Sequence, residues 1–480
     1  ARPAYQSLFE LLGTEDGYGR GVHLSELPDV DANEAIARYL RAVYETEPLA
    51  QRPSVLYTQM QRASTWAFHL YPMLDDLIQI SPHPLPDREP FLVDWISFLR
   101  MQNAPSGSHV DAWLREAVQL SQGTPGLASL ARAEGRTYPR AYLDWFTALA
   151  AEDRYQELLD AAQEALEVLP DGWPIRAAIA DHLCVAAARL NEADVLRRGR
   201  WAAFSARPTL ARLLDLWEAA EDEAERSVLM QRAIAHFRDY LAHPPAARAD
   251  MGITRDNLDS PAFIGRPELA HACLLAGDWE AAHQLAAQGK GIGWSSSESY
   301  QGMVLAAFLA LLSGEPPTAL PSNLAQLWQW NVQSSTRSWG WVGDNQKNSV
   351  IQRLERAYTE QFAGAALRPF QENKPPKYKQ FSEGKVSGLE GLNSRNYLSA
   401  ELQEKLLAWC IAVAHQRVDA IVGNQRRKSY DKAAVLTVAC AETLRRRGDA
   451  SAARSLVDAV RERFPRHSAF QREMKNALSR

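Results

Sequence analysis

The chain has 480 residues, of which 46% are hydrophobic and 23% are charged, and its formal net charge is −5. This composition excludes an intrinsically disordered chain, which is poor in hydrophobic residues and strongly charged. We find no apolar run of the roughly 18 residues that a membrane span needs, and no apolar signal core near the first residue. Because the sequence begins with Ala1 and not with Met, we expect a processed chain or a segment of a longer protein.

The charge is distributed unevenly along the chain. Residues 366–480 contain 22 Lys and Arg against 12 Asp and Glu, a net charge of +10, which leaves −15 for residues 1–365. Such asymmetry is typical either of an electrostatic binding surface at one end or of solvated helix faces.

The four cysteines predict neither a metal site nor a disulfide framework. Cys184, Cys273, Cys410 and Cys440 each lie in an apolar stretch, at least 30 residues from one another, whereas a zinc site has two ligands a few residues apart. We therefore expect buried free thiols, no metal and no cofactor. Scattered free cysteines also favour a reducing compartment, so we expect a cytoplasmic protein.

Apolar residues recur at spacings of three and four almost throughout, which predicts an all-α chain. Residues 1–137 form an N-terminal helical section without a clear repeat. Its predicted helices cover residues 33–44, 55–80, 89–101 and 110–120, and proline-rich segments separate them.

Residues 138–315 are expected to form an array of helical hairpins. The predicted helices cover residues 140–151 and 155–168, 174–190 and 193–205, 210–219 and 223–241, then 267–275, 279–288 and 297–312. Pro170, Pro208 and Pro244 close the first three hairpins at intervals of 38 and 36 residues. These intervals are slightly longer than the 34 residues of a regular tetratricopeptide repeat.

The periodicity breaks in residues 316–399, which we interpret as an irregular insertion region. Short helices are predicted at 324–330 and 350–362, and a long loop at 369–396. Residues 400–480 return to helical hairpins, with helices at 400–422, 430–447 and 469–478.

The most regular segment is 448–465, where Gly448 opens a helix and Pro465 ends it. Ala453, Val457 and Val460 fall on one face of this helix. The same pattern covers residues 153–170, with Leu158, Ala162 and Ala165 facing inward, and begins again at Gly277.

These segments resemble the second helix of tetratricopeptide-type repeats, a resemblance that implies a right-handed solenoid of divergent helical hairpins. Residues 200–210 and 453–470 are also similar to the helical arrays of bacterial proteins that carry a SWIM-type zinc finger. The CxC and CxH pairs of that finger are absent, so no metal or nucleic-acid role follows from this similarity.

We find no HExxH motif, nucleophile elbow or recognisable carboxylate pair that would predict catalysis. The Gly-rich run at 289–297 follows a predicted helix and not a strand, so we interpret it as a helix break.

The candidate binding region is rich in tryptophan and lysine. The predicted partner-binding residues are Trp328, Trp330, Arg337, Trp339, Trp341, Lys374, Lys377, Tyr378 and Lys379. Aromatic residues beside an arginine in irregular structure are typical of binding hot spots. The alternative is a tryptophan-rich plug that packs a connection between repeats.

The leading functional hypothesis is a non-catalytic scaffold that binds a protein or peptide on the concave face of a repeat array. One alternative is nucleic-acid binding through Arg426 to Lys428, Arg445 to Arg447 and the lysines of the insertion. Another is a helical enzyme that acts on a glycan, with tryptophans as stacking subsites.

Overall fold

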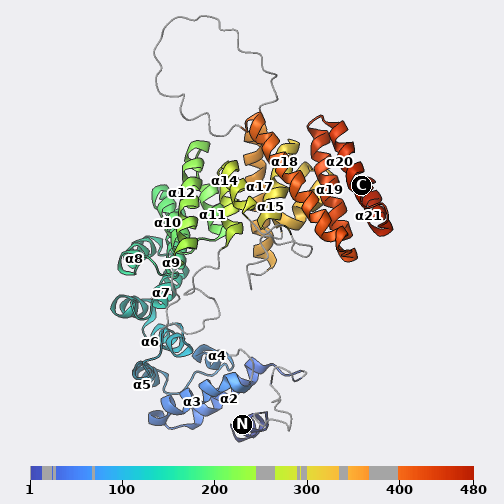
Figure 1. The fold of residues 1–480 in the computed structure, drawn as a ribbon. Helices are drawn as coiled ribbons and strands as arrows, with labels where there is room; N and C mark the ends of the chain where they lie inside the picture. The colour runs from blue at the N-terminus through green and yellow to red at the C-terminus, as the bar shows by residue number, and fades with distance from the viewer. Residues whose placement is uncertain are drawn as a thin grey trace, which may run out of the picture. The chain divides into compact units, whose positions relative to one another are not determined.

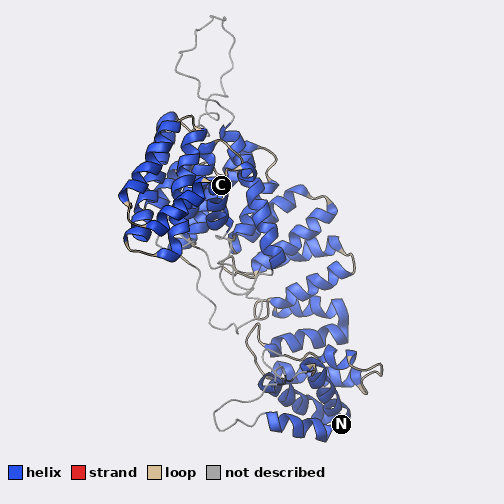
Figure 2. Ribbon diagram, turned by 90° about the vertical axis from the view of Figure 1, so that its right-hand side faces the viewer, coloured by secondary structure: helices blue, strands red, loops and turns tan. Residues whose placement is uncertain are grey.

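All regular secondary structure in the described part of the chain is helical. The computed structural model describes residues 2–12, 24, 27, 29–66, 71–244, 265–288, 292, 300–333, 344–366 and 398–480. Helices of the α, 3-10 and π types occur in these residues, and no strand does, as Figure 2 shows. The predicted all-α class is therefore confirmed over these ranges.

The helices belong to two compact units (Figure 1). Unit 1 contains α1 to α10, and unit 2 contains α11 to α21. The predicted division into sections 1–137, 138–315, 316–399 and 400–480 stays a prediction.

The described residues of unit 1 form a series of helices. They are α1 Arg2–Leu12, α2 Ala32–Thr46, η2 Leu49–Gln51, α3 Arg52–Trp66, α4 Leu74–Gln79, α5 Arg88–Met101, α6 His109–Glu134, α7 Arg140–Ala151, α8 Tyr155–Val168, α9 Arg176–Leu190 and α10 Ala193–Ala206.

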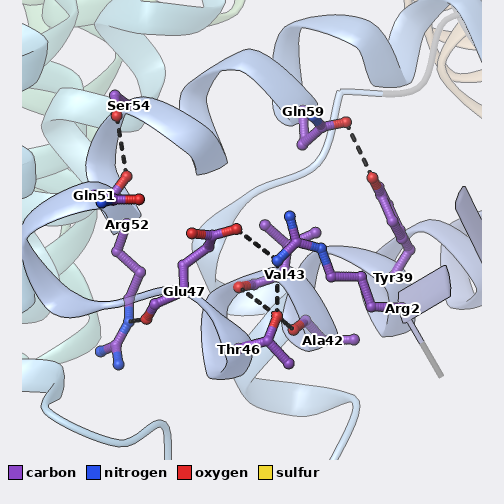
Figure 3. Close-up of polar contacts among 10 residues, drawn as sticks. All are labelled: Arg2, Tyr39, Ala42, Val43, Thr46, Glu47, Gln51, Arg52, Ser54 and Gln59. Carbon is purple, nitrogen blue, oxygen red and sulfur yellow. Dashed lines mark hydrogen bonds and ion pairs between the residues drawn. The ribbon is translucent and has the colours of Figure 1, made fainter.

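Arginine side chains tie the first helices of unit 1 together (Figure 3). Arg2 of α1 donates a hydrogen bond of 2.9 Å to Thr46 Oγ1 and forms an ion pair of 2.5 Å with Glu47, just after α2. Arg52, at the start of α3, donates to the carbonyl oxygen of Glu47 at 3.0 Å. Arg52 thereby satisfies a backbone carbonyl group that the end of α2 leaves open.

Small residues allow paired helices in unit 1 to approach closely. Ala162 and Ala165 of α8 are 0% exposed, which confirms the predicted inward face. In α10, a Cβ atom on Gly199 would lie only 2.8 Å from Cys184 Sγ of α9. A larger residue at position 199 would therefore push α9 and α10 apart.

Two predicted helices in the N-terminal section were wrong in extent. The helix predicted at 55–80 is divided, because α3 ends at Trp66 and α4 begins only at Leu74, after Pro72, which disfavours a helix at the residue before it. The helix predicted at 110–120 continues to Glu134 as α6. Gly123 adopts φ 63° and ψ −156° inside α6, a kink that glycine tolerates, and Pro125 then occupies the first turn of the second half.

Unit 2 contains the remaining helices. They are α11 Leu210–Ala219, α12 Glu223–Ala242, α13 Arg266–Leu275, α14 Trp279–Ala287, α15 Tyr300–Ser313, η3 Pro317–Ala319, α16 Ser322–Trp328, η4 Gln329–Gln333, α17 Asp344–Ala366, α18 Ala400–Val418, η6 Asp419–Gly423, η7 Arg427–Ser429, α19 Tyr430–Arg446, α20 Ala450–Arg463 and α21 Ser468–Leu478.

Helix α15 is the centre of unit 2. Every residue from Gln301 to Ser313 is buried, as expected of a helix that is apolar on all sides. It contacts α13, α14 and α16 to α19. Helices far apart in the sequence thus share one core in this unit.

A buried hydrogen bond links α13 to α17 inside this core. It joins His271 Nδ1 and the hydroxyl oxygen of Tyr358 at 2.7 Å. Burial lowers the pKa of His271 to about 3, so the imidazole stays neutral at physiological pH.

The C-terminal helices pack against the start of α16. Glu442 of α19 accepts hydrogen bonds from Asn323 Nδ2 at 2.8 Å and from the backbone N–H of Leu324 at 2.9 Å. The predicted inward residues of α20, Ala453, Val457 and Val460, are all buried. The predicted inward face of this helix is therefore confirmed.

One stretch of unit 2 is long and apolar enough to cross a membrane by length and composition, contrary to our reading of the sequence. It covers Ala400–Gly423, which comprises α18 and η6, and half of it is buried within the protein. A core helix passes the same test, so this stretch gives little reason to infer a membrane span.

Candidate functional site

The structure describes two of the nine predicted binding residues, Trp328 and Trp330. Trp328 is 2% exposed, and its ring lies edge-on to Tyr358 and Phe362 of α17, at centroid distances of 5.4 and 6.2 Å. Trp330 is half-buried in η4. The Trp328 side chain thus packs into the core of unit 2, as the alternative hypothesis of a tryptophan-rich plug between repeats predicts for this residue.

The other seven residues, Arg337, Trp339, Trp341, Lys374, Lys377, Tyr378 and Lys379, lie outside the described residues. The proposed partner surface in this region therefore stays a prediction.

The most distinctive concave surface in the described residues lies in unit 1, between α4, α6 and α7. We call it the acidic groove. It has a volume of about 720 Å³ and is lined by Met73, Asp75, Asp76, Arg88, Ala112, Arg115, Glu116, Gln119, Leu120 and Asp144. Four carboxylates and two guanidinium groups therefore face the same space.

Glu116 connects two walls of the acidic groove. Its two carboxylate oxygens accept hydrogen bonds of 2.8 Å from the backbone N–H groups of Leu74 and Asp75, at the start of α4. Burial is the main cause that raises the pKa of Glu116 to about 7, and the negative charges of Asp76 and Asp75 also raise it. The two hydrogen bonds from backbone N–H groups act in the opposite direction and lower the pKa. The cap holds α4 in place because it satisfies N–H groups that a helix start leaves open.

Arg115 carries little free charge into the groove. Its guanidinium pairs with Asp111 at 3.2 Å and also with Asp144. Burial lowers its pKa, and these two carboxylates more than offset that effect, so the pKa of Arg115 is raised. With Arg115 neutralised, Asp75, Asp76 and Glu116 face only Arg88.

A smaller groove of about 290 Å³ lies beside the second half of α6, lined by Thr124, Pro125, Ala128, Arg132, Trp145, Arg154, Glu157, Asp160, Ala161 and Glu164. Its cations are already paired. Arg132 lies 4.7 Å from the ring centroid of Trp145 and pairs with Glu164 at 2.9 Å, and Arg154 pairs with Glu157 at 2.6 Å. Asp160 adds a further negative charge to this wall.

Of the basic residues proposed for nucleic-acid binding, those that the structure describes lie at opposite ends of α19. Arg427 and Lys428 precede α19, whereas Arg445 to Arg447 lie at its other end. A helix of 17 residues is about 25 Å long. Arg446 also pairs with Glu315 at 3.1 Å, and Arg447 with Glu404 at 2.5 Å.

Sequence reasoning missed the acidic groove. In the sequence, Asp75 and Asp76 have the pattern of a solvent-exposed helix face. Glu116 lies more than 40 residues along the chain from the backbone N–H groups that it binds, so the contact leaves no local signal. The detectable signal was Pro72, which separates α3 from α4 and so creates a new helix start next to two carboxylates.

No family model matches this chain, and no curated protein matches it significantly. The resemblances to tetratricopeptide-type and SWIM-associated arrays therefore rest on the sequence pattern. Among the described residues, no three His, Cys, Asp or Glu side chains form a group that could hold a metal ion.

Proposed function

We propose that the chain is a non-catalytic scaffold and that its acidic groove holds a Lys- and Arg-rich segment of a partner protein. The observation that carries this proposal is the groove itself, where Arg115 is paired with Asp111 and Asp144, and Asp75, Asp76 and Glu116 lie with Arg88 as the other arginine of the lining. Complementary charge of this kind favours the encounter with a basic partner and selects against acidic ones.

The proposed architecture is a right-handed, tetratricopeptide-like solenoid in unit 1. Support comes from the packing order, since α9 contacts α7, α8 and α10, and a solenoid repeat contacts mainly its neighbours. Buried alanines on α8 fit the same arrangement. In unit 2, the contacts of α15 with α18 and α19 argue for a closed bundle.

A catalytic role for Glu116 is less well supported, although a raised carboxyl pKa in a cleft is a property of general acids. Both of its oxygens already accept backbone hydrogen bonds. A general acid must direct its proton at a substrate, so the contacts favour a structural cap.

The test is the binding of a fluorescent peptide of alternating Arg and Ser to the full chain, measured by anisotropy. Asp75→Lys and Gln119→Lys place positive charge in the groove at exposed positions. We expect each to weaken binding by about tenfold, which corresponds to about 1.4 kcal/mol.

The matched control is Glu167→Lys, which changes the charge at an exposed site on α8 outside both grooves. An equal loss of affinity in this control would show that only net charge matters and would refute the groove assignment. Equally strong binding of a peptide of alternating Glu and Ser would also refute it.

A further inference from the structure

An aromatic pair lies at one end of the acidic groove. The rings of Tyr71 and His109 are stacked, with their centroids 3.4 Å apart and their planes 17° from parallel. Tyr71 comes two residues before Met73, and His109 comes three residues before Ala112. Both Met73 and Ala112 line the groove. The pair therefore marks the end of the groove at which α6 begins.

The pair has a fixed position along α6. One residue after Tyr71, the carbonyl oxygen of Pro72 accepts a hydrogen bond of 2.9 Å from Trp113 Nε1, and Glu116 then binds the start of α4. His109 and Glu116 are seven residues apart, which is two helical turns or about 10 Å along the axis, so they lie on the same face of α6. The segment from Tyr71 onward thus follows the face of α6 that carries Glu116.

Tyr71 offers an aromatic surface to a cation at this end of the groove. The residue is 38% exposed, and because His109 covers one face of the ring, the open surface belongs mainly to the other face and the edge. Burial lowers the pKa of His109, so the imidazole is neutral at physiological pH and adds no positive charge beside a bound cation. The ring face of Tyr71 itself attracts cations.

We propose that Tyr71 makes the acidic groove selective for arginine over lysine. A guanidinium group is planar and weakly hydrated, so it stacks on an aromatic face, whereas the ammonium group of lysine is a compact, strongly hydrated point charge. One arginine of the partner segment stacks on Tyr71, and neighbouring basic residues pair with the exposed carboxylates of Asp75 and Asp76. This inference rests on the proposed function, because it states which basic side chain the groove selects.

The experiment compares two fluorescent peptides of equal length and charge, one of alternating Arg and Ser and one of alternating Lys and Ser, by anisotropy with the full chain. We expect the arginine peptide to bind about fivefold more tightly. Tyr71→Leu keeps an apolar side chain and removes the ring, so the two affinities should then agree within about twofold, through weaker binding of the arginine peptide alone. Unchanged binding of the lysine peptide shows that this variant is folded.

Two further variants serve as controls. Tyr71→Trp keeps an aromatic face and should keep the preference for arginine, since tryptophan is the aromatic residue that binds cations best. Tyr155→Leu removes a tyrosine of α8 that is outside the linings of both grooves and whose ring already faces Arg189 at 5.6 Å. This variant should also keep the preference.

The outcomes separate this inference from the proposed function. If Asp75→Lys weakens both peptides but the unaltered chain binds them equally, or the preference survives in Tyr71→Leu, the groove assignment holds and the role of Tyr71 is refuted. If neither peptide binds, or Asp75→Lys leaves both affinities unchanged, the groove assignment itself is wrong, and the inference about Tyr71 is refuted with it.

Discussion

Alanine residues determine how closely α20 packs on its neighbours. Ala453 is 0% exposed, and α20 contacts α19. We predict that Ala453→Asp lowers the free energy of unfolding of unit 2 by about 3 to 5 kcal/mol, because it buries a carboxylate without a partner. Denaturant titration of the full chain, followed by tryptophan fluorescence, measures this change.

Ala459→Asp is the control, since position 459 is exposed on the same helix. Away from the core, a surface substitution of this kind changes stability by roughly 0.5 kcal/mol or less. Similar losses at the two positions would contradict the assignment of the faces of α20.

At the scale of single elements, the cap on α4 makes unit 1 sensitive to pH. The folded state raises the pKa of Glu116 from 4.5 to about 7, so the folded state binds more protons than the unfolded state between these values. The contribution of Glu116 to the free energy of unfolding is therefore complete below pH 4.5, and it is lost as the pH rises through 7.

We predict that the unfolding free energy of unit 1 falls between pH 5 and pH 8, with a contribution from Glu116 of order 3 kcal/mol. Glu116→Gln does not titrate, so its unfolding free energy should fall less over the same range. Calorimetric melting of both proteins at several pH values tests this, and parallel curves for the two proteins would argue against it.

Elements with local signals were predictable, and elements fixed by distant contacts were not. Helices α7, α8 and α11 were predicted to the residue, because their apolar period and turn residues lie within one hairpin. The helix predicted at 110–120 ends too early, because the chain resumes the helix after the kink at Gly123.

The candidate sites were harder to predict for the same reason. The cap by Glu116 joins residues 42 positions apart, so no local pattern in the sequence predicts it. By contrast, the tryptophan excess was visible in the sequence, but the burial of Trp328 depends on its contacts with Tyr358 and Phe362 of α17, 30 or more residues later.

At the scale of the whole molecule, unit 2 depends on its last helices. Because α15 packs against α18 and α19, we predict that a chain ending at residue 366 leaves α15 exposed and loses the cooperative unfolding of unit 2. Limited proteolysis should then degrade residues 208–366 and spare α5 to α10. A protease-resistant unit 2 in this shorter chain would refute the prediction.

The central position of α15 also sets the timing of folding during synthesis. Helices α7 to α10 contact their neighbours and can pack as they leave the ribosome. By contrast, 116 residues separate Ser313, the end of α15, from Tyr430, the start of α19. At a synthesis rate of ~5 to 20 residues per second, roughly 5 to 25 s pass between the synthesis of α15 and that of α19, with which it packs. During that interval, the apolar surface of α15 that α19 later covers is prone to aggregation.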